Sequence, residues 1–462
     1  MRNTEIAFLA DACRGKLYGN KNTIINDVRI DSRECAFGTL FVCIKGENND
    51  GHDYVGKAYE KGCRAFLVSE EYLRPDYADA AFVAVSDTSL AFRDMAKAYL
   101  DQFKLIKVGV TGSVGKTTTK MLSAAVMSAK YKTVCTQKNY NTHLGLCMTA
   151  FLADENTEAI VFEMGMDRSN EIHEYCEWVR PDAALITCVG ITHLERLGSR
   201  DKIADAKLEI THFLKEDAPL IVNCDGDYLS EKEIRERADG PYRCVLCGEK
   251  EDAKIRLSEI TDFGNEGIEF KLNGIGFDLP ILGIHNAHNA ALAAALGLEY
   301  GISLEESAEA LSKVRAYQRR LEAEKCGSIY LIDDSYNASP DSMKAALAVL
   351  ASVKGKRKIA VLADMLELGT EEEKGHLEVG VCAAEKNINF LIAIGRRAAY
   401  YVKGANKTSA SVNTLSFVDN ASAMLCLENM LRPGDAVLVK GSNSTKVSEI
   451  AEMLREKYKK EN

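Results

Sequence analysis

A glycine-bearing segment, Thr111-Gly112-Ser113-Val114-Gly115-Lys116-Thr117-Thr118, carries the side chains best suited to chemistry. It follows an apolar run at residues 105–110 and precedes a helix-compatible run at residues 116–129, which predicts a strand, a loop and a helix. In this setting backbone N–H groups and the positive end of the helix attract a phosphate. Lys116 can reach the β- and γ-phosphates, and the Thr117 hydroxyl can hold Mg²⁺. The glycine spacing is not that of the common phosphate loop, but the pattern predicts ATP binding.

Two polar residues stand at the ends of neighbouring apolar runs. Glu163 closes the run at residues 159–163, and His193 follows the run at residues 184–189. Because ligands of a parallel sheet bind beyond the carboxyl ends of its strands, both side chains are expected near the phosphate loop. Glu163 is predicted to bind a Mg²⁺ that bridges ATP phosphates, although a buried, paired carboxylate also fits the pattern. His193 alone also fits a structural histidine in a loop.

The order of the apolar runs predicts an α/β fold. With 462 residues, the chain is long enough for about three domains. The central part is predicted to form a doubly wound, mostly parallel sheet from strands at residues 105–110, 133–135, 159–163, 184–189 and 220–223. The predicted domains are a small α/β domain at residues 1–85, a phosphate-loop domain at residues 86–315 and a Rossmann-like domain at residues 316–462.

The composition excludes several classes of protein. The net charge of −10 argues against nonspecific nucleic-acid binding, which needs a basic face. The apolar stretch at residues 6–10 is too short for a signal-peptide core or a membrane span, so a cytoplasmic protein without membrane insertion is expected. The 14 cysteines lie on apolar segments, as small buried hydrophobes do. Cys244 and Cys247 form one CxxC pair, and because zinc would need a second, a strand leading into a turn is predicted.

Longer motifs make the chain resemble the Mur ligases over nearly its full length and in all three domains. The first domain carries Asp31-Ser32-Arg33 and Asp50-Gly51-His52, two elements of this family. The other motifs are Glu163-Met164-Gly165-Met166, His193-Leu194-Glu195-Arg196-Leu197-Gly198-Ser199, Gly283-Ile284-His285-Asn286-Ala287-His288-Asn289, Asp334-Ser335-Tyr336-Asn337-Ala338-Ser339-Pro340-Asp341-Ser342-Met343 and Val361-Leu362-Ala363-Asp364-Met365-Leu366-Glu367-Leu368-Gly369.

The chain is most similar to the family member that adds D-alanyl-D-alanine to UDP-N-acetylmuramoyl-tripeptide in peptidoglycan precursor synthesis. This resemblance implies an ATP-dependent, ADP-forming ligase. The tripeptide carboxylate would take the γ-phosphoryl group of ATP, and the dipeptide amine would then displace phosphate from the acyl phosphate. UDP-N-acetylmuramoyl-tripeptide and D-Ala-D-Ala are therefore the expected partners, and we expect the protein to be a monomer.

Several other interpretations stay open. The ligase that adds the third peptide residue usually carries an Asp-Asn-Pro-Arg motif, which this chain lacks. Folylpolyglutamate synthase shares the ATP core but not a first domain of this kind. A nucleotide-binding regulatory protein that does not turn over ATP would not need residues for a second metal ion, whereas this chain keeps residues for such a site. A structural partner in cell-wall assembly would need an interaction segment, and none is visible.

The resemblance also implies roles for individual residues. Pattern alone places Lys207 on a helix surface, but it matches a lysine that CO₂ carbamylates, and that carboxylate would support a second Mg²⁺ beside His193. The expected catalytic residues are Lys116, His193 and Lys207, and the expected metal ligands are Thr117, Glu163, His193 and Lys207. The expected nucleotide contacts are Thr111, Gly112, Ser113, Gly115, Lys116, Thr117, Thr118, Asn289, Arg320, Asp334 and Asn337. The expected substrate contacts are Ser32, Arg33, Asp50, Gly51 and His52 for the UDP end, together with Asn139 and Asn141.

The split of the nucleotide contacts between two domains implies movement. We expect a hinge at residues 313–320 and closure when ligands bind. The chain departs from the family pattern at four positions, with His143 for an acid, Cys147 for a proline, Asn170 for a glycine and Ser339 for an asparagine. The change at His143 concerns substrate detail more than the class of reaction.

Overall fold

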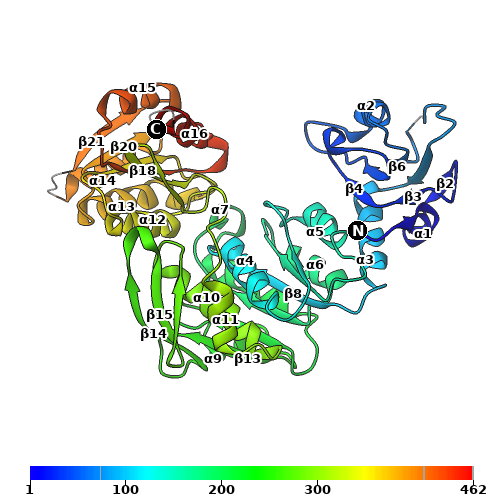
Figure 1. Cartoon of the computed structure of the whole chain (residues 1–462), viewed down its shortest axis with the longest axis horizontal. Helices are drawn as coiled ribbons and strands as arrows, with labels where there is room; N and C mark the ends of the chain where they lie inside the picture. The colour runs from blue at the N-terminus through cyan, green and yellow to red at the C-terminus, as the bar shows by residue number, and fades with distance from the viewer. Residues whose placement is uncertain (73, 409–411, 460–462) are drawn as a thin grey trace.

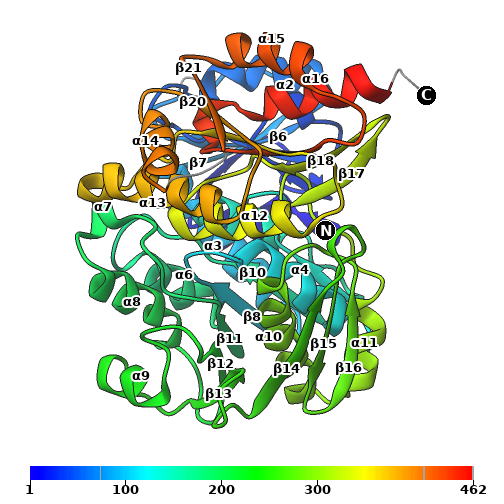
Figure 2. The same ribbon diagram turned by 90° about the vertical axis from the view of Figure 1, so that its left-hand side faces the viewer.

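The computed structural model describes residues 1–72, 74–408 and 412–459. Three α/β units follow one another along the chain, and the first and the third both stand on the second (Figure 1). In the view turned by 90° the third unit lies in front of the first (Figure 2). The predicted α/β class and three-part architecture are confirmed. The domain boundaries at residues 86 and 316 stay predictions.

The first unit is built on a five-stranded sheet in the order β2-β7-β6-β5-β4. Strand β2 runs antiparallel to β7, and the other pairs are parallel. Strands β1 and β3 form a separate antiparallel pair. The strands are β1 (Thr4–Glu5), β2 (Lys16–Tyr18), β3 (Ile24–Ile25), β4 (Asp27–Arg29), β5 (Thr39–Val42), β6 (Ala65–Ser69) and β7 (Ala81–Val85). The helices are α1 (Ile6–Ala12) and α2 (Val55–Glu60), with 3₁₀ turns at Ser32–Glu34 and Gly51–Tyr54.

The second unit has a nine-stranded sheet in the order β16-β15-β14-β13-β12-β11-β8-β10-β9. From β9 to β14 neighbouring strands are parallel, and β14, β15 and β16 add an antiparallel extension. Strand β10 is buried along its whole length, as expected for a parallel strand covered on both faces. The strands are β8 (Ile106–Thr111), β9 (Thr133–Cys135), β10 (Ala159–Glu163), β11 (Ala183–Ile186), β12 (Pro219–Asn223), β13 (Arg243–Gly248), β14 (Ile255–Asp262), β15 (Ile268–Leu272) and β16 (Ile275–Leu279).

The helices of the second unit cover both faces of this sheet. Helix α10 packs against α4, the helix that follows the phosphate loop. The helices are α3 (Thr88–Leu100), α4 (Lys116–Met127), α5 (His143–Ala150), α6 (Glu171–Val179), α7 (Leu194–Leu197), α8 (Arg200–Leu208), α9 (Glu231–Arg237), α10 (His285–Glu299) and α11 (Leu304–Leu311), with 3₁₀ turns at Glu209–Thr211 and Gly264–Glu266. The predicted strand at Cys244 and Cys247 is confirmed as β13, and both thiols are free.

The third unit has a six-stranded sheet in the order β17-β18-β22-β19-β20-β21, parallel except for β17. The strands are β17 (Glu322–Cys326), β18 (Ile329–Asp334), β19 (Lys358–Ala363), β20 (Phe390–Ile394), β21 (Asn413–Phe417) and β22 (Ala436–Lys440). The helices are α12 (Pro340–Ser352), α13 (Glu372–Glu385), α14 (Ala399–Lys407), α15 (Asn420–Met430) and α16 (Ser448–Lys459), with 3₁₀ turns at Gly369–Glu371 and Asn443–Thr445. No helix in the described parts of the chain combines the length and the apolar character needed to cross a membrane.

The joints between the units differ. One cluster of buried apolar side chains extends from the first unit into the second, from Ile6 and Val83 to Phe151 and Phe162. Helix α3 lies within this cluster and packs against both α1 and α5. The third unit instead has two further core clusters, one of which includes Leu282 of the second unit, and its chain connection to the second is the segment between α11 and β17. The expected hinge at residues 313–320 falls in this segment.

Tyr99 of α3 ties the first joint together. Its side chain is fully buried, and its ring centroid lies 4.9 Å from that of Phe151. Its hydroxyl donates a hydrogen bond to the Ala153 carbonyl at 2.6 Å and accepts one from the Arg2 amide at 2.8 Å. The Tyr99 hydroxyl therefore links the N-terminal segment to the second unit through two hydrogen bonds.

We predict that Tyr99→Phe lowers the free energy of unfolding by about 1–3 kcal/mol, because it leaves a buried carbonyl without its donor. Urea-induced unfolding followed by circular dichroism measures this loss. The matched control is Tyr18→Phe, whose ring is 38% exposed on the first unit. Equal urea midpoints for wild type and Tyr99→Phe would show that the two hydrogen bonds add no stability.

Candidate functional site

The phosphate loop runs from the end of β8 to the start of α4, as predicted. Gly112 and Gly115 have φ angles of +145° and +86°, a region that side-chain-bearing residues rarely adopt. A Cβ atom at Gly112 would lie 1.8 Å from Thr187 Oγ1, and one at Gly115 would lie 2.7 Å from Asn289 Oδ1. Both positions therefore require glycine for backbone conformation and for space.

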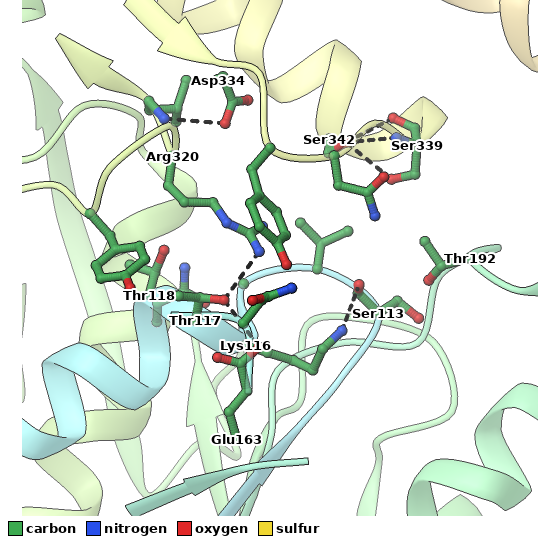
Figure 3. Close-up of a pocket in the computed structure, with 18 of the residues that line it drawn as sticks. Ser113, Lys116, Thr117, Thr118, Glu163, Thr192, Arg320, Asp334, Ser339 and Ser342 are labelled. Carbon is green, nitrogen blue, oxygen red and sulfur yellow. Dashed lines mark hydrogen bonds between the residues drawn. The ribbon is translucent and has the colours of Figure 1, made fainter. Parts of the chain in front are cut away.

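Lys116 lies folded over this loop. Its Nζ atom donates hydrogen bonds to the carbonyls of Gly112 at 2.8 Å and Ser113 at 3.3 Å (Figure 3). Burial lowers the pKa of the Lys116 amine, while the Glu163 carboxylate opposes that shift. A lysine held over the loop by two backbone carbonyls is placed to meet a phosphate that enters it.

Glu163, at the end of β10, points toward the start of α4. Its Oε1 atom accepts hydrogen bonds from Thr117 Oγ1 at 3.1 Å and Asn141 Nδ2 at 3.0 Å. Its Oε2 atom is buried and accepts no hydrogen bond from the described residues, although Lys120 Nζ lies 3.4 Å away. A hydroxyl and a carboxylate with a free buried oxygen are the donors that Mg²⁺ prefers. The residues present thus fit a magnesium ion at this place.

The third unit closes the site from the opposite side. Arg320 Nη2 donates a hydrogen bond to Thr117 Oγ1 at 3.2 Å, and its guanidinium carbon lies 3.8 Å from the ring centroid of Tyr336 (Figure 3). Asp334, at the end of β18, accepts hydrogen bonds from the Leu321 amide at 3.1 Å and from Lys440 Nζ at 2.6 Å. The Asn337 carbonyl accepts a second bond from Lys440 at 2.9 Å. The contact of Arg320 with Thr117 joins the third unit to the start of α4, and Asp334 and Asn337 line the same cavity as the phosphate loop.

Helix α10 forms another wall of the site. Asn289 Oδ1 accepts a hydrogen bond from Thr119 Oγ1 at 3.1 Å, and Asn289 Nδ2 donates one to Asn286 Oδ1 at 2.8 Å. His285 lies on the first turn of the helix, and burial lowers the pKa of its imidazole to about 4. Around neutral pH this face of the site is therefore uncharged.

His193 lies at the meeting point of the second and third units. Its backbone has a φ of +64°, and its Nδ1 atom lies 3.2 Å from Asp167 Oδ1 and 3.1 Å from Glu367 Oε2. The ligand atoms of these three side chains all lie within 4.8 Å of one another. The contact with His193 lowers the pKa of Glu367, so that carboxylate is ionised at neutral pH. The predicted position of His193 in a loop beyond β11 is confirmed.

Lys207, on α8, is deeply buried, so the surface position that pattern alone favours is wrong. Only 1% of the residue is exposed, because α8 packs against the rest of the second unit with Lys207 on its inner face. No carboxylate among the described residues forms an ion pair with it. Burial, together with the charge of Lys116, lowers the pKa of the Lys207 amine to about 7. The amine therefore loses its proton at a lower pH than an exposed lysine does.

A cavity of about 460 Å³ at the phosphate loop collects most of the predicted residues. Three of the predicted nucleotide-binding, metal-binding and catalytic residues do not line it. The Thr111 hydroxyl donates a hydrogen bond to the Met164 carbonyl at 2.9 Å, Gly112 packs on Thr187, and Lys207 is buried. The predicted residues that do line it are Ser113, Gly115, Lys116, Thr117, Thr118, Asn139, Asn141, Glu163, His193, Asn289, Arg320, Asp334 and Asn337.

The predicted UDP-binding residues lie apart from this cavity, in the first unit. Arg33 is held by Asp31, whose carboxylate accepts its Nε at 3.0 Å, and the arginine side chain is 85% exposed. His52 Nδ1 lies 2.5 Å from Asp50 Oδ1, and its Nε2 accepts the Ser69 amide at 2.9 Å. Ser32 is buried, and Gly51 packs closely on the backbone of Ile44 and Cys43. The structure thus orders both motifs, and the Arg33 guanidinium is paired with Asp31 while most of its side chain stays exposed to solvent.

Sequence reasoning missed several residues of the site. Lys440 and Asp167 follow the ends of β22 and β10, so the strand-end rule that found Glu163 could have found them. Lys120 lies on a helix, where a lysine is normally exposed, and Tyr317 lies in a loop without a local signal. Glu367 belongs to one of the family motifs, but the motif alone gave it no role. The residues missed are Lys120, Asp167, Tyr317, Tyr336, Glu367 and Lys440.

Two departures from the family pattern have a structural explanation. Asn170 has a φ of +66°, the left-handed conformation that glycine adopts freely and asparagine tolerates better than most residues. Ser339 precedes α12, and its side chain forms a capping box with Ser342. Cys147 is buried in α5, and His143 Nε2 lies 3.4 Å from the Ser89 carbonyl. His143 therefore faces α3 and not the large cavity.

Comparison with known proteins accounts for the chain from one end to the other. Models of the Mur ligase family match residues 24–100 (catalytic domain), 110–297 (middle domain) and 319–443 (glutamate ligase domain). The UDP-N-acetylmuramoyl-tripeptide–D-alanyl-D-alanine ligase of Bacillus subtilis is 37% identical over 97% of each chain. The crystal structure of MurF from Acinetobacter baumannii is 30% identical, covers 99% of each chain and has a TM-score of 0.87. MurF from Thermotoga maritima, solved in complex with ADP, shares the fold with a TM-score of 0.79 at 24% identity.

Full-length similarity at this level, together with a phosphate loop, a buried strand-end glutamate and a third unit that contacts both, leaves one family. The chain belongs to the Mur ligases.

Proposed function

We propose that this protein is an ATP-dependent, ADP-forming ligase that adds D-Ala-D-Ala to UDP-N-acetylmuramoyl-tripeptide. The observation that carries the proposal is the cavity at the phosphate loop, where Lys116, Glu163 and His193 of the second unit meet Arg320 of the third. The relatives of nearly equal length, among them the one quoted above at 37% identity, are named for this reaction. The Asp-Asn-Pro-Arg motif of the ligase for the third peptide residue is absent.

The residues of the cavity can carry the two steps of this reaction. The tripeptide carboxylate attacks the γ-phosphorus of ATP, and the bond to ADP breaks, giving an acyl phosphate. The dipeptide amine then attacks the acyl carbon, loses a proton, and phosphate leaves. Lys116 and Arg320 lie where negative charge develops in the first step, so they stabilise its transition state. Positioning by the two units supplies the remaining acceleration.

Thr117 and Glu163 would hold the magnesium ion. Both offer oxygen atoms, and the buried Glu163 Oε2 lacks a hydrogen-bond donor among the described residues. When bound, Mg²⁺ would neutralise charge on the phosphates of ATP. Asn141 keeps the carboxylate in place through its 3.0 Å hydrogen bond to Oε1.

We further propose that Lys207 is carbamylated and serves, with His193, a second magnesium site. The neutral amine forms a bond from nitrogen to the carbon of CO₂ and releases one proton, which leaves an anionic carbamate. The surroundings favour carbamylation, because Lys207 is buried beside the positive Lys116 without a carboxylate partner among the described residues. Removing a cation from this place and adding an anion relieves that repulsion.

The first unit is proposed to hold the UDP end of the substrate. The exposed Arg33 has a planar set of donors that suits a diphosphate. Asn139 and Asn141, on the loop before α5, lie between this unit and the phosphate loop and are proposed to contact the substrate between its two ends. We propose that the protein acts as a monomer in the cytoplasm, where nucleotide-linked precursors and ATP are available.

The first prediction about function concerns the ligation reaction itself. Phosphate release from ATP should require both UDP-N-acetylmuramoyl-tripeptide and D-Ala-D-Ala, and Lys116→Ala should lower kcat by about 10²–10³-fold, since it removes a charge at the transferred phosphoryl group. A coupled phosphate assay measures both effects. Lys232→Ala, on the exposed face of α9, is the control and should keep full activity. Release that is independent of the dipeptide would refute the proposed function.

The second prediction concerns the carbamate. Lys207→Ala should lower kcat by about 10²–10³-fold, and added formate or acetate should restore part of it by supplying a carboxylate. Nuclear magnetic resonance with ¹³C-bicarbonate should show a carbamate signal in wild type that the variant lacks. Lys202→Ala, on the exposed side of the same helix, is the control. Full activity in untreated Lys207→Ala would exclude the carbamate.

The third prediction concerns closure. Small-angle X-ray scattering should show a smaller radius of gyration when a non-hydrolysable ATP analogue and UDP-N-acetylmuramoyl-tripeptide are added, because the third unit contributes Arg320 to the nucleotide site. The same radius with and without both ligands would contradict a hinge at residues 313–320.

A further inference from the structure

A second cavity, of about 280 Å³, opens beside the first at the boundary between the second and third units. Thr192, His193 and Glu367 line both cavities, so the two are continuous. In the view of Figure 3, Thr192 and Ser339 lie at one end of the site, away from Glu163 and Thr118. No residue of the phosphate loop lines the second cavity in the described parts of the chain. Its occupant therefore approaches the reacting groups from a side away from the phosphate loop.

The lining of this cavity restricts the charge of its occupant. Glu367 is the one carboxylate among the described lining residues, and none of them is a lysine or an arginine. A diphosphate or triphosphate, which needs cationic partners, is thus disfavoured. Leu366, Leu368 and Ala338 offer apolar contact, and Asn443 and Ser444 offer neutral hydrogen-bond donors. A small ligand with one ammonium group, short apolar side chains and one carboxylate matches this lining.

The Glu367 side chain is set for such a role. Its backbone φ of +63° is uncommon for a residue other than glycine, and strained conformations of this kind concentrate at functional sites. The loop that carries it is fixed to the loop after β22, because Ser442 Oγ accepts the Leu366 amide at 3.0 Å and the Ser442 amide donates to the Asp364 carbonyl at 3.1 Å. The carboxylate is thereby held toward His193, with 47% of its side chain still exposed.

The opposite wall has an unpaired polar group. Thr192 Oγ1 is buried and has no hydrogen-bond partner among the described residues. Buried hydroxyl groups of this kind normally find a partner, so a ligand is a natural acceptor or donor for it. The cavity thus has a polar atom from the second unit facing an anion from the third.

We propose that this second cavity is the subsite for the incoming D-Ala-D-Ala and that Glu367 binds its ammonium group. The proposal rests on the proposed function and deepens it. The methyl groups pack against Leu366, Leu368 and Ala338, and the carboxylate accepts hydrogen bonds from Asn443 and Ser444. Because its walls come from two units, the subsite is complete only when these units meet.

The test compares steady-state constants of wild type, Glu367→Gln, Glu367→Asp and a control, Glu371→Gln. Glu371 lies four positions further along, pairs with Lys374 at 2.8 Å and does not line the cavity. Loss of a hydrogen bond to a charged group predicts a KM for D-Ala-D-Ala about 10- to 100-fold higher in Glu367→Gln. Glu367→Asp should recover part of this loss, and the constants for ATP, UDP-N-acetylmuramoyl-tripeptide and Mg²⁺ should stay within about twofold.

Binding gives a second readout that does not require turnover. In the presence of a non-hydrolysable ATP analogue and UDP-N-acetylmuramoyl-tripeptide, calorimetry should show that wild type prefers D-Ala-D-Ala to N-acetyl-D-Ala-D-Ala, which lacks the ammonium. Glu367→Gln should lose most of this preference, and equal melting temperatures would show that it is folded. An unchanged preference in the variant would overturn the proposal.

Two other results would also overturn it. A raised Mg²⁺ requirement with an unchanged KM for the dipeptide would assign Glu367 to a metal, in line with its closeness to His193 and Asp167. Equal constants for Glu367→Gln and Glu371→Gln would remove any specific role. If wild type itself releases phosphate without the dipeptide, the proposed function fails first, so the two failures are distinguishable.

Discussion

The phosphate-loop side of the site depends on several positive charges gathered around one buried carboxylate, Glu163. Lys116, Lys120, Lys207 and Arg320 surround the cavity or lie just behind it, and Glu163 is the acid buried among them. Charges removed from water are costly unless anions compensate them. A polyphosphate provides that compensation, which explains why the depressed pKa values of Lys116 and Lys207 occur together.

The fold supports this arrangement because polar residues stand at the carboxyl ends of parallel strands. Strands β8, β10, β18 and β22 each bring a polar residue to the carboxyl edge of a sheet, and the edges of two different sheets face each other across the cavity. The backbone at this edge is constrained, as the tight packing of Gly112 against Thr187 shows. A site assembled from two sheets can thus keep its side chains in fixed positions on each sheet edge when the two edges move apart.

The sequence predicts one half of the site better than the other. Gly112, Lys116 and Glu163 follow from strand, loop and helix order, because local apolar runs place them at a sheet edge. Lys207 could not be placed in the same way, since its helix lacks a clear apolar face and pattern alone put the lysine outside. Glu367 lies in a loop whose position depends on contacts with Ser442, far along the chain. Tertiary contacts between distant segments leave no local pattern to recognise.

The shared core between the first and second units has a consequence for substrate selection. Since α3 and Tyr99 are embedded in apolar side chains of both units, the distance between Arg33 and the phosphate loop is fixed by packing. If Arg33 holds one end of a long substrate, as proposed, this fixed span acts as a molecular ruler. A peptide stem that is too short would leave its terminal carboxylate short of Lys116, and one that is too long would overshoot. Length would then be measured at the joint between the first and second units, and the identity of the added group at the subsite proposed between the second and third.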